Sequence, residues 1–396
     1  MAFDVSQLAA YTKDNQDSLI SKSLFNAKTQ KLIVSEGNVM TEVKSAEQIN
    51  VLDTDAVFQA GGTCGFSSSG TTVFTRRAVT IGKIKVHESL CPKTLEAKYL
   101  QLKMKAGSIP QEIPFEQVYS ELKAGKIAEQ LETALWQGDT LSGNANLARF
   151  DGLIKLLDAA GTAIVANGKT GTGTITATTG STAVTGVGTI FTTEIAVGDK
   201  LYNSASTLIG TVASITTDTA LVLVANGAVA VTAAGFVDVP VSATINFASP
   251  VLATTGISKT NIRTIIDSVW RSIPPRVKGK EDVVIFVGWE VFEAYISKLI
   301  DDNNYVYTAG NNAQADGEIL IPGTNYKIIA LHGLDSTNRI YALRLSNLYM
   351  GCDILGEEDN FEIFYAKEAM EVRFVAEFKL GINVAFPNEV VSFKLV

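Results

Sequence analysis

The stretch IPFEQVYSELKAGKIAEQLETALWQGD, residues 113–139, carries the longest uninterrupted helical pattern in the chain. Pro114 suits the first helical turn, and Gly138 can adopt the left-handed conformation that ends many helices. Residues 115–137 would form a rod of about 35 Å, and Gly125 in its middle indicates that another segment comes close. By itself the pattern also fits an ordinary core helix of an enzyme. The predicted apolar stripe consists of Phe115, Val118, Leu122, Ile127, Leu131 and Leu135.

The residues before this helix lack the pattern of a closed core. Residues 1–60 contain two short amphipathic stretches, at 3–11 and 19–25, separated by polar residues. We expect an arm that packs on another part of the molecule or on a neighbouring subunit. Residues 61–91 begin with the loop-like GGTCGFSSSG and continue with many β-branched residues, which predicts an extended two-stranded excursion. Pro92 then opens a short helical pattern.

The composition of the whole chain limits the classes of protein to which it can belong. With 396 residues, of which 46% are hydrophobic, the chain can bury a large core and more than one domain. Its net charge of −8 argues against a protein that grips nucleic acid through a basic face. Three widely spaced cysteines, Cys64, Cys91 and Cys352, suggest reduced thiols in a cytoplasm and form no metal knuckle. The start of the chain has no signal-peptide pattern, so secretion is not expected.

A sharp change of composition marks residues 165–240. Thr, Gly, Ala and Val dominate there in short runs divided by turn residues, which predicts an inserted small all-β barrel or sandwich. A disordered linker is the alternative, but the apolar residues present could supply a core. Residues 219–237 are long enough to imitate a membrane span, yet Asn226-Gly227 in the middle predicts a β-hairpin instead. The only charged residues between 165 and 240 are Lys169, Glu194, Asp199, Lys200, Asp218 and Asp238.

Helical and strand patterns alternate again after residue 250. An apolar stripe at 262–270 stops at Pro274-Pro275, and DVVIFVGWEVFEAYISKLI reads as a buried strand, a turn and a helix. In the closing residues, 361–396, apolar and polar side chains alternate as they do in strands. We expect them to return beside the long helix.

The chain offers little material for a catalytic or metal site. His87 and His332 are its only histidines, and a structural role is the simpler interpretation of each. Gly168-Lys169-Thr170 lacks the earlier glycine of a phosphate loop, and GFSSSG is one residue too long for a nucleophile elbow. The paired carboxylates Glu357-Glu358 and Asp301-Asp302 lie in polar connections. We therefore predict no catalytic, cofactor or metal residues and no enzyme activity.

The order of these parts resembles the major capsid proteins of tailed bacteriophages, which have the Hong Kong 97-type shell fold. The strings KIKVHESLCPKTLE, IPFEQ, ALWQGD and FDGLIKLL are similar to those of capsid proteins from crAss-like and other Bacteroides-infecting phages. Outside residues 165–240 the resemblance covers nearly the whole chain. It implies an α+β fold with these parts: an N-terminal arm, 1–60; an extended β loop, 61–91; a peripheral domain, 92–160 and 350–396, with the spine helix 115–137; the inserted all-β domain, 165–240; and an axial domain, 245–349.

The resemblance also implies a function and partners. The protein would assemble through pentamers and hexamers into an icosahedral shell that encloses double-stranded DNA without sequence-specific binding, in the virion, after assembly in the bacterial cytoplasm. Scaffold, portal and decoration proteins would be further partners, with no cofactor and no membrane. Some family members cross-link subunits through a Lys and an Asn, and Lys83 and Lys85 lie in the expected loop, but no Asn partner is identifiable. The alternatives are an encapsulin-like cargo shell and a soluble hydrolase with a β-rich accessory module.

Overall fold

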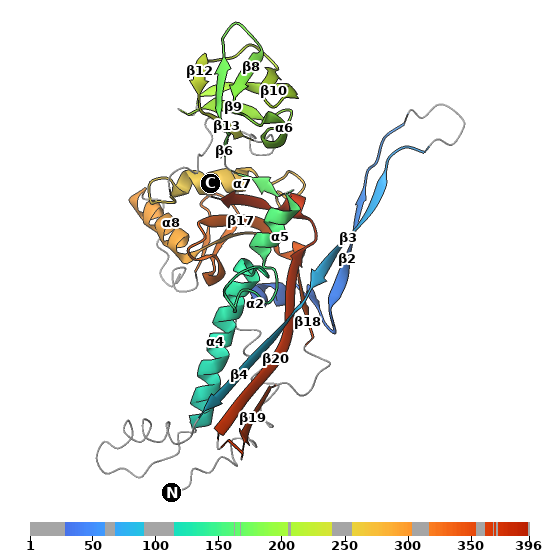
Figure 1. Cartoon of the computed structure of the whole chain (residues 1–396), viewed down its shortest axis with the longest axis vertical. Coiled ribbons are helices and arrows are strands. Elements are labelled where there is room, and N and C mark those ends of the chain that lie inside the picture. Colours follow the sequence, from blue (N-terminus) through green and yellow to red (C-terminus); the bar gives the residue numbers. More distant parts are fainter. Residues whose placement is uncertain are drawn as a thin grey trace. The chain divides into compact units, whose positions relative to one another are not determined.

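The computed structural model describes residues 28–59, 68–90, 115–161, 163–166, 168–204, 207–239, 256–302, 317–353, 361–366, 368–369 and 371–394. The chain divides into two compact units. The first comprises residues 1–159 and 346–385, and the second comprises 160–345 and 386–396. Both contain helices and sheets (Figure 1), so the predicted α+β class is confirmed.

A five-stranded sheet organises the first unit. Its longest strand, β20 (Glu371–Val384), pairs antiparallel with β4 along one edge, from Val372 opposite Leu90 to Leu380 opposite Gly82. β18 and β19 pair antiparallel with β20, and β1 pairs parallel with β18. The remaining strands are β1 (Val39–Met40), β4 (Gly82–Leu90), β18 (Leu348–Cys352) and β19 (Phe361–Ala366).

The predicted long helix is confirmed as α4, Phe115–Gln137. In its described half, Leu131 and Leu135 are 3% and 0% exposed, as the apolar stripe predicts. Among the described residues, a Cβ on Gly125 would meet nothing within 4 Å, so the close approach of another segment there stays a prediction. The side chains of Phe115, Val118 and Leu122 lie outside the described residues.

Gly138 is needed for close packing and not for a left-handed turn. Its φ is not among the positive values, so that expectation was wrong. A Cβ at Gly138 would lie 2.5 Å from the carbonyl oxygens of both Ala134 and Phe150. The Gly152 N–H donates to the Gly138 carbonyl at 2.8 Å and leads into α5 (Leu153–Ala160). Two glycines thus let the end of α4 touch the start of α5.

The two-stranded excursion is formed by different strands from those predicted. β2 (Ala46–Thr54) pairs antiparallel with β3 (Thr72–Thr80), while β4 pairs with β20. Only Ile81 separates β3 from β4, which leaves no room for a hairpin turn, and the chain runs on from one sheet to the next. The ribbon therefore starts inside the expected arm, 1–60, and ends before Lys83 and Lys85. The helix α2 (Lys28–Ser35) precedes it.

The second unit contains an α/β layer with a six-stranded sheet in the order β15-β16-β14-β17-β21-β5. β14 (Val283–Val287) is buried along its whole length, because it lies between β16 and β17 and packs against helices. The helices are α7 (Ile262–Arg271) and α8 (Trp289–Asp301). The other strands are β5 (Ile164–Val165), β15 (Glu318–Leu320), β16 (Lys327–Ala330), β17 (Arg339–Arg344) and β21 (Val391–Lys394), with 3-10 turns at His332–Leu334 and Pro387–Glu389. A third 3-10 turn, Leu345–Asn347, lies at the boundary between the two units.

The closing residues divide between the two units. β19 and β20 join the sheet of the first unit, but β21 pairs with β17 and with β5 in the second. The expected peripheral segment 350–396 is therefore wrong at its end. Phe393 is 0% exposed in the core of the α/β layer, and this burial fixes β21 there.

Residues 168–239 form an eight-stranded sheet in the order β12-β7-β8-β11-β10-β9-β13-β6. A separate apolar cluster fills it, in which Phe191 and Phe236 meet edge to face at 5.8 Å. β6 pairs antiparallel with β13, so the first and last strands lie side by side. The elements are β6 (Lys169–Thr170), β7 (Thr174–Ala177), β8 (Ala183–Val187), α6 (Phe191–Glu194), β9 (Lys200–Asn203), β10 (Leu208–Thr217), β11 (Ala220–Leu223), β12 (Val231–Ala234) and β13 (Phe236–Val239).

The hairpin predicted at Asn226-Gly227 is wrong. The strands on either side of it, β11 and β12, do not pair with each other, because β11 pairs with β8 and β10 whereas β12 pairs with β7. Gly227 instead donates its N–H to the Ser181 carbonyl at 3.0 Å, in a connection between strands. The tight turn lies earlier, where Thr217 pairs with Ala220.

Several predictions fall on residues that the structure does not describe. These are the short helices expected within residues 1–27, the helix expected after Pro92, and most of GGTCGFSSSG. In the described part of the chain, no helix is long and apolar enough to cross a membrane.

Candidate interaction surfaces

The ribbon β2–β3 is the most exposed apolar feature of the described chain. At its base Ile49, Val51 and Val79 are buried, at 5%, 7% and 0% exposure. Farther out, large side chains face solvent, and Phe58 and Phe74 are 100% and 76% exposed. The exposed apolar tip consists of Leu52, Val57, Phe58, Val73 and Phe74.

The outer ribbon keeps its shape through hydrogen bonds across the two strands. The Asp55 N–H donates to the Thr71 carbonyl at 2.9 Å, and the Ser69 hydroxyl donates to the Val57 carbonyl at 3.2 Å. Gly70 has a φ of +91°, and a Cβ there would lie 2.8 Å from the Asp55 carbonyl oxygen. The apolar side chains are therefore held on an ordered ribbon.

The base of the ribbon is fixed to β20 by a polar contact that the sequence analysis missed. Arg77 Nη2 donates to Asn383 Oδ1 at 3.3 Å, and Asn383 Nδ2 donates to the Ala78 carbonyl at 2.6 Å. Burial lowers the pKa of Arg77. Because these residues are about 300 positions apart, no local pattern could have revealed the contact.

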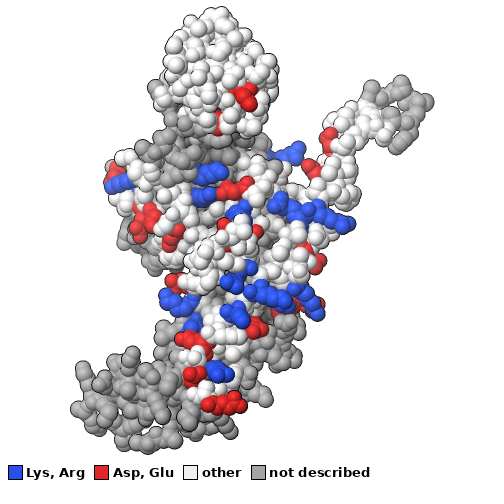
Figure 2. Space-filling view, in the orientation of Figure 1, with Lys and Arg blue, Asp and Glu red and all other residues white. Residues whose placement is uncertain are grey.

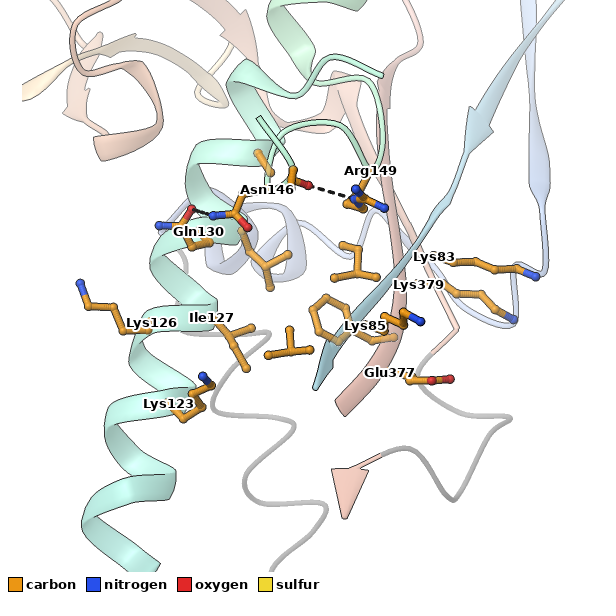
Figure 3. A pocket seen from close by; sticks show the side chains of 16 residues that line it. Lys83, Lys85, Lys123, Lys126, Ile127, Gln130, Asn146, Arg149, Glu377 and Lys379 are labelled. Carbon is orange, nitrogen blue, oxygen red and sulfur yellow. Dashed lines mark hydrogen bonds between the residues drawn. The ribbon is translucent and has the colours of Figure 1, made fainter. Parts of the chain in front are cut away.

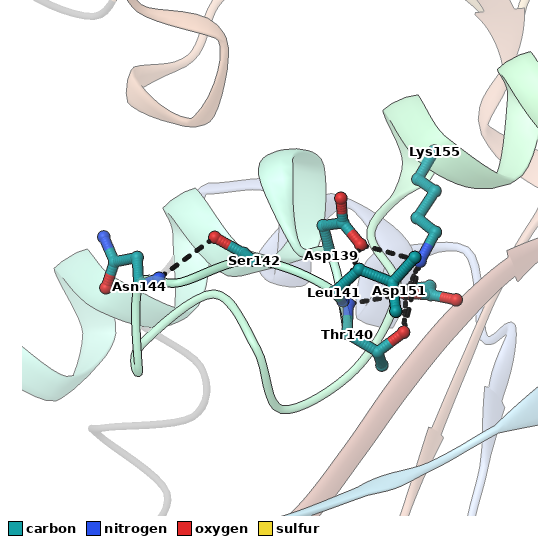
Figure 4. Close-up of polar contacts among 7 residues, drawn as sticks. All are labelled: Asp139, Thr140, Leu141, Ser142, Asn144, Asp151 and Lys155. Atoms are coloured by element: carbon teal, nitrogen blue, oxygen red, sulfur yellow. Dashed lines mark hydrogen bonds and ion pairs between the residues drawn. The ribbon is translucent and has the colours of Figure 1, made fainter.

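A second polar cluster holds the loop after α4 (Figure 4). Lys155 Nζ donates to Asp139 Oδ1 at 2.7 Å and to Asp151 Oδ1 at 2.8 Å, and these bonds raise the pKa of Lys155. The pKa of Asp139 is lowered first by the hydrogen bond from Lys155 and then by the hydrogen bond from the Leu141 N–H. Burial acts to raise the pKa of Asp151, but hydrogen bonds from Lys155 and Thr140 outweigh it and lower the pKa. The cluster ties WQGD to FDGLIKLL and has no evident chemistry.

The two histidines lie in different units and make ordinary contacts. His87 in β4 lies 3.3 Å from Glu377, with both side chains 47% exposed. His332 stacks on Trp289 and lies 2.8 Å from Asp335. Asp335 Oδ1 in turn accepts the Trp289 N–H at 2.8 Å, which caps α8. Their positions suit a structural role.

The remaining sequence candidates are dispersed. Lys169 and Thr170 form the short strand β6. Asp301 makes an ion pair with Lys259. Asp302 makes ion pairs with Arg263 of α7 and Lys298 of α8. Glu357 and Glu358 lie outside the described residues. Within the described ranges no group of three or more His, Cys, Asp or Glu side chains could hold a metal ion. Cys352 is buried, at 0% exposure.

Charge is unevenly distributed over the visible face. Figure 2 shows few charged side chains over the β-rich residues 168–239, and many Lys, Arg, Asp and Glu on the other described parts. Positive and negative side chains alternate there. This distribution does not resemble a continuous basic surface.

No protein-family model matches the chain, and no curated protein matches its sequence. Among solved structures, it is similar to a procapsid of satellite phage P4 that includes the size determination protein Sid, at 11% identity and a TM-score of 0.47, over 98% of this chain and 96% of that chain. It is also similar to the capsid of a native GTA particle, at 11% identity and a TM-score of 0.48, over 95% of this chain and 91% of that chain. A third similar structure is the capsid of Myoviridae phage XM1, at 11% identity and a TM-score of 0.42, over 92% of this chain and 91% of that chain.

Proposed function

We propose that this chain is the major capsid protein of a tailed bacteriophage, a structural subunit of the Hong Kong 97 type. The observation that carries the proposal is the ribbon β2–β3, whose tip exposes five large apolar side chains. A two-stranded ribbon is marginally stable by itself in water, and monomers rarely expose such surface. Burial against a neighbouring subunit would stabilise it by about 25 cal/mol per Å² of apolar area covered.

The sequence resemblance supports the same function. The strings that carry it form the long helix α4, the strand β4 and the Lys155 cluster. These parts belong to the compact first unit, which also contains the ribbon, an arrangement suited to a subunit that contacts several neighbours. Contacts at several edges make a closed particle stable even when each is weak.

The finer proposals follow from the resemblance. The shell would be icosahedral, built of pentamers and hexamers, and would enclose double-stranded DNA in the virion of a phage that infects Bacteroides-type bacteria. Scaffold, portal and decoration proteins would be its partners. Residues 165–240 would be an inserted domain, and the proposed peripheral and axial domains would fall largely in the first and second units.

Shortening the ribbon tests this proposal. Leu52 pairs with Phe74, so residues 53–73 can be replaced by Asn-Gly, which closes two paired strands with a tight turn. Removal of the whole of 61–91 would be a poor test, because β4 pairs with β20 along its length. The shortened chain should fold with an unchanged melting temperature but remain as monomers or isolated capsomers in light scattering. The intact chain, with its scaffold if one is required, should form closed shells in electron micrographs.

A matched pair of substitutions separates the ribbon from general surface effects. Phe74→Asp should prevent shell closure, whereas Val224→Asp, at a residue that is 68% exposed in the β-rich region, should not. Closed shells from the shortened chain would overturn the proposed role of the ribbon. Shells that package protein cargo would favour an encapsulin-like function, and a stable monomer that hydrolyses a substrate would favour the hydrolase.

A further inference from the structure

Two of the cations beside the long helix already have partners within the chain. Figure 3 shows a groove between α4 and the paired strands β4 and β20, with several lysines at its edges. Lys123 there is ion-paired with Glu88, and Lys126 is ion-paired with Glu129 at 2.6 Å. These two lysines therefore need no further partner.

The second unit carries cations of a different kind, at the end of α7 and in the loop that leads to β14. We call these residues the basic loop: Arg271, Arg276, Lys278 and Lys280. All four are exposed, and within the described ranges none of them has an ion-pair partner. Of the two acids that follow, Glu281 and Asp282, the second is ion-paired with Arg344 at 3.0 Å. The basic loop therefore keeps a positive charge in a chain whose net charge is −8.

Contacts with two aromatic rings and with the backbone fix the basic loop in place. The Arg271 guanidinium lies 5.1 Å from the centre of the Trp270 ring, and Lys278 Nζ donates to the Arg271 carbonyl at 3.0 Å. Trp270 lies 6.4 Å from the ring of Tyr326, whose hydroxyl accepts the Gly279 N–H at 3.4 Å. The positive charges are thus presented on an ordered surface at the end where β14 begins.

The other end of β14 carries exposed acids. α8 begins there, and its Glu290 and Glu293 are both exposed. Residues three apart on a helix lie on the same face, so we call this pair the acidic turn. Glu290 accepts a hydrogen bond from the Ser336 hydroxyl at 3.4 Å. In the described part of the chain, neither carboxylate has a cation as an ion-pair partner.

The basic loop and the acidic turn cannot neutralise each other within one chain. They lie at opposite ends of β14, which spans about 17 Å, whereas an ion pair requires an N···O distance of about 4 Å or less. In a head-to-tail contact, however, the basic loop of one copy meets the acidic turn of the next. Heterologous contacts of this kind form rings where the rotation between copies closes. The phosphates of a nucleic acid would also suit the basic loop, but they would leave the acidic turn without a role.

We propose that the basic loop of one copy binds the acidic turn of the next copy in a head-to-tail ring. Complementary charges at the contact select this orientation and offset the repulsion between copies that each carry a charge of −8. The inference goes beyond the proposed function, because it requires rings and not a closed shell. The ribbon β2–β3 has no part in it, so rings without shells would support this inference and contradict the proposed function.

Charge reversal tests the contact. The double variant Lys278→Glu, Lys280→Glu places like charges opposite each other, so association should weaken at least about tenfold. Light scattering should show the mass of the monomer in place of that of rings or shells. The double variant Glu290→Lys, Glu293→Lys should behave in the same way. An unchanged assembly of either variant would overturn the proposal.

A matched control reverses the same number of charges elsewhere. The double variant Lys31→Glu, Lys44→Glu changes two exposed lysines of the first unit and should assemble like the natural chain. All three variants should keep the natural melting temperature, because the substituted side chains are exposed. Loss of assembly in the control as well would show that net charge, and not this contact, governs association.

A mixture of the two reversed chains gives the sharpest result. Neither chain associates by itself, but opposite charges meet again wherever the two kinds of chain alternate. The mixture should therefore form rings with an even number of subunits, hexamers and not pentamers, in native mass spectrometry. A mixture that remains monomeric contradicts the proposed pairing.

Carbodiimide cross-linking, which joins a carboxylate to a lysine in direct contact, identifies the residues. In a mixture of chains labelled with ¹⁴N and ¹⁵N, links should join lysines of the basic loop to carboxylates of the acidic turn in a differently labelled chain. The ion pair between Lys123 and Glu88 is an internal positive control. Links only within one chain, or links to other carboxylates of the second chain, overturn the proposal. It is also overturned if reversal of the basic loop abolishes binding of short double-stranded DNA at about 0.15 M salt while assembly is unchanged.

Discussion

Thr29 and Glu132 are 103 residues apart in the sequence, yet the Thr29 hydroxyl donates to Glu132 Oε1 at 2.5 Å inside the first unit. The same hydroxyl accepts the indole N–H of Trp136 at 2.9 Å. Thr29 and Trp136 are fully buried. This group of three side chains joins α2 to the long helix α4, and so fixes the segment from which the ribbon β2–β3 extends.

Replacing Thr29 by Val should destabilise the protein measurably. The change keeps the shape of the side chain but removes two buried hydrogen bonds, for an expected loss of about 1–3 kcal/mol in the free energy of unfolding. Denaturant unfolding followed by tryptophan fluorescence measures it. Thr179→Val is the control, because Thr179 is exposed in the β-rich region. Equal stability of the two variants would show that the contact contributes little.

Leu135→Ala should create a cavity under α4. Leu135 is 0% exposed, and truncation of a buried leucine costs about 2–5 kcal/mol. Leu141→Ala provides the same chemical change at a leucine that is 87% exposed and should be nearly silent. The two melting temperatures give the comparison, and similar values would mean that α4 does not pack as described.

The Lys155 cluster should make stability depend on pH. The pKa values of Asp139 and Asp151 are lowered from 3.8, so their contribution is present above pH 3.8 and is lost as the pH falls through the lowered values. The pKa of Lys155 is raised from 10.5, so its contribution is present below pH 10.5 and is lost as the pH rises through the raised value.

Lys155→Met tests this dependence. Its melting temperature should lie below that of the natural chain by a constant amount between about pH 5 and 9. The difference should shrink below pH 3.8, where the aspartates become protonated. Lys327→Met, at an exposed lysine of β16, should show no such dependence. A difference that persists unchanged into acid would mean that the ion pairs are not its cause.

Residues 168–239 should fold by themselves. Val237 lies opposite Thr170 in antiparallel strands, so the ends of the region are about 5 Å apart. Deletion of 168–239 with a short Gly-Ser bridge should leave a soluble protein with its helical circular dichroism intact. The deletion must keep Ala166, whose carbonyl accepts a hydrogen bond from the buried Ser268.

The excised fragment 168–239 should unfold cooperatively with a β-type spectrum. An unfolded fragment, together with loss of helical signal in the deleted chain, would show that the two parts depend on each other. The expectation rests on the separate apolar cluster around Phe191 and Phe236.

The sequence by itself determined the elements whose signals are local. The spacing of Leu131 and Leu135 defines a helical stripe, and the bounds 115–137 were predicted correctly. The stripe at 262–270 likewise became α7. In both cases a period of 3.6 residues places apolar side chains on one face whatever the helix packs against. Composition also located the β-rich region, because a low charge and frequent turn residues are visible without knowledge of the partners.

Only the tertiary structure decided which strands pair and which residues meet. β4 joins β20 and not its neighbour β3, β21 enters the second unit, and Asn226-Gly227 does not form the predicted hairpin. A strand carries the same alternating pattern whichever partner it has, so pairing depends on burial over the whole sheet. The bond between Thr29 and Glu132 and the contact between Arg77 and Asn383 each combine residues far apart in the chain, and such contacts exist only once the long-range packing is complete.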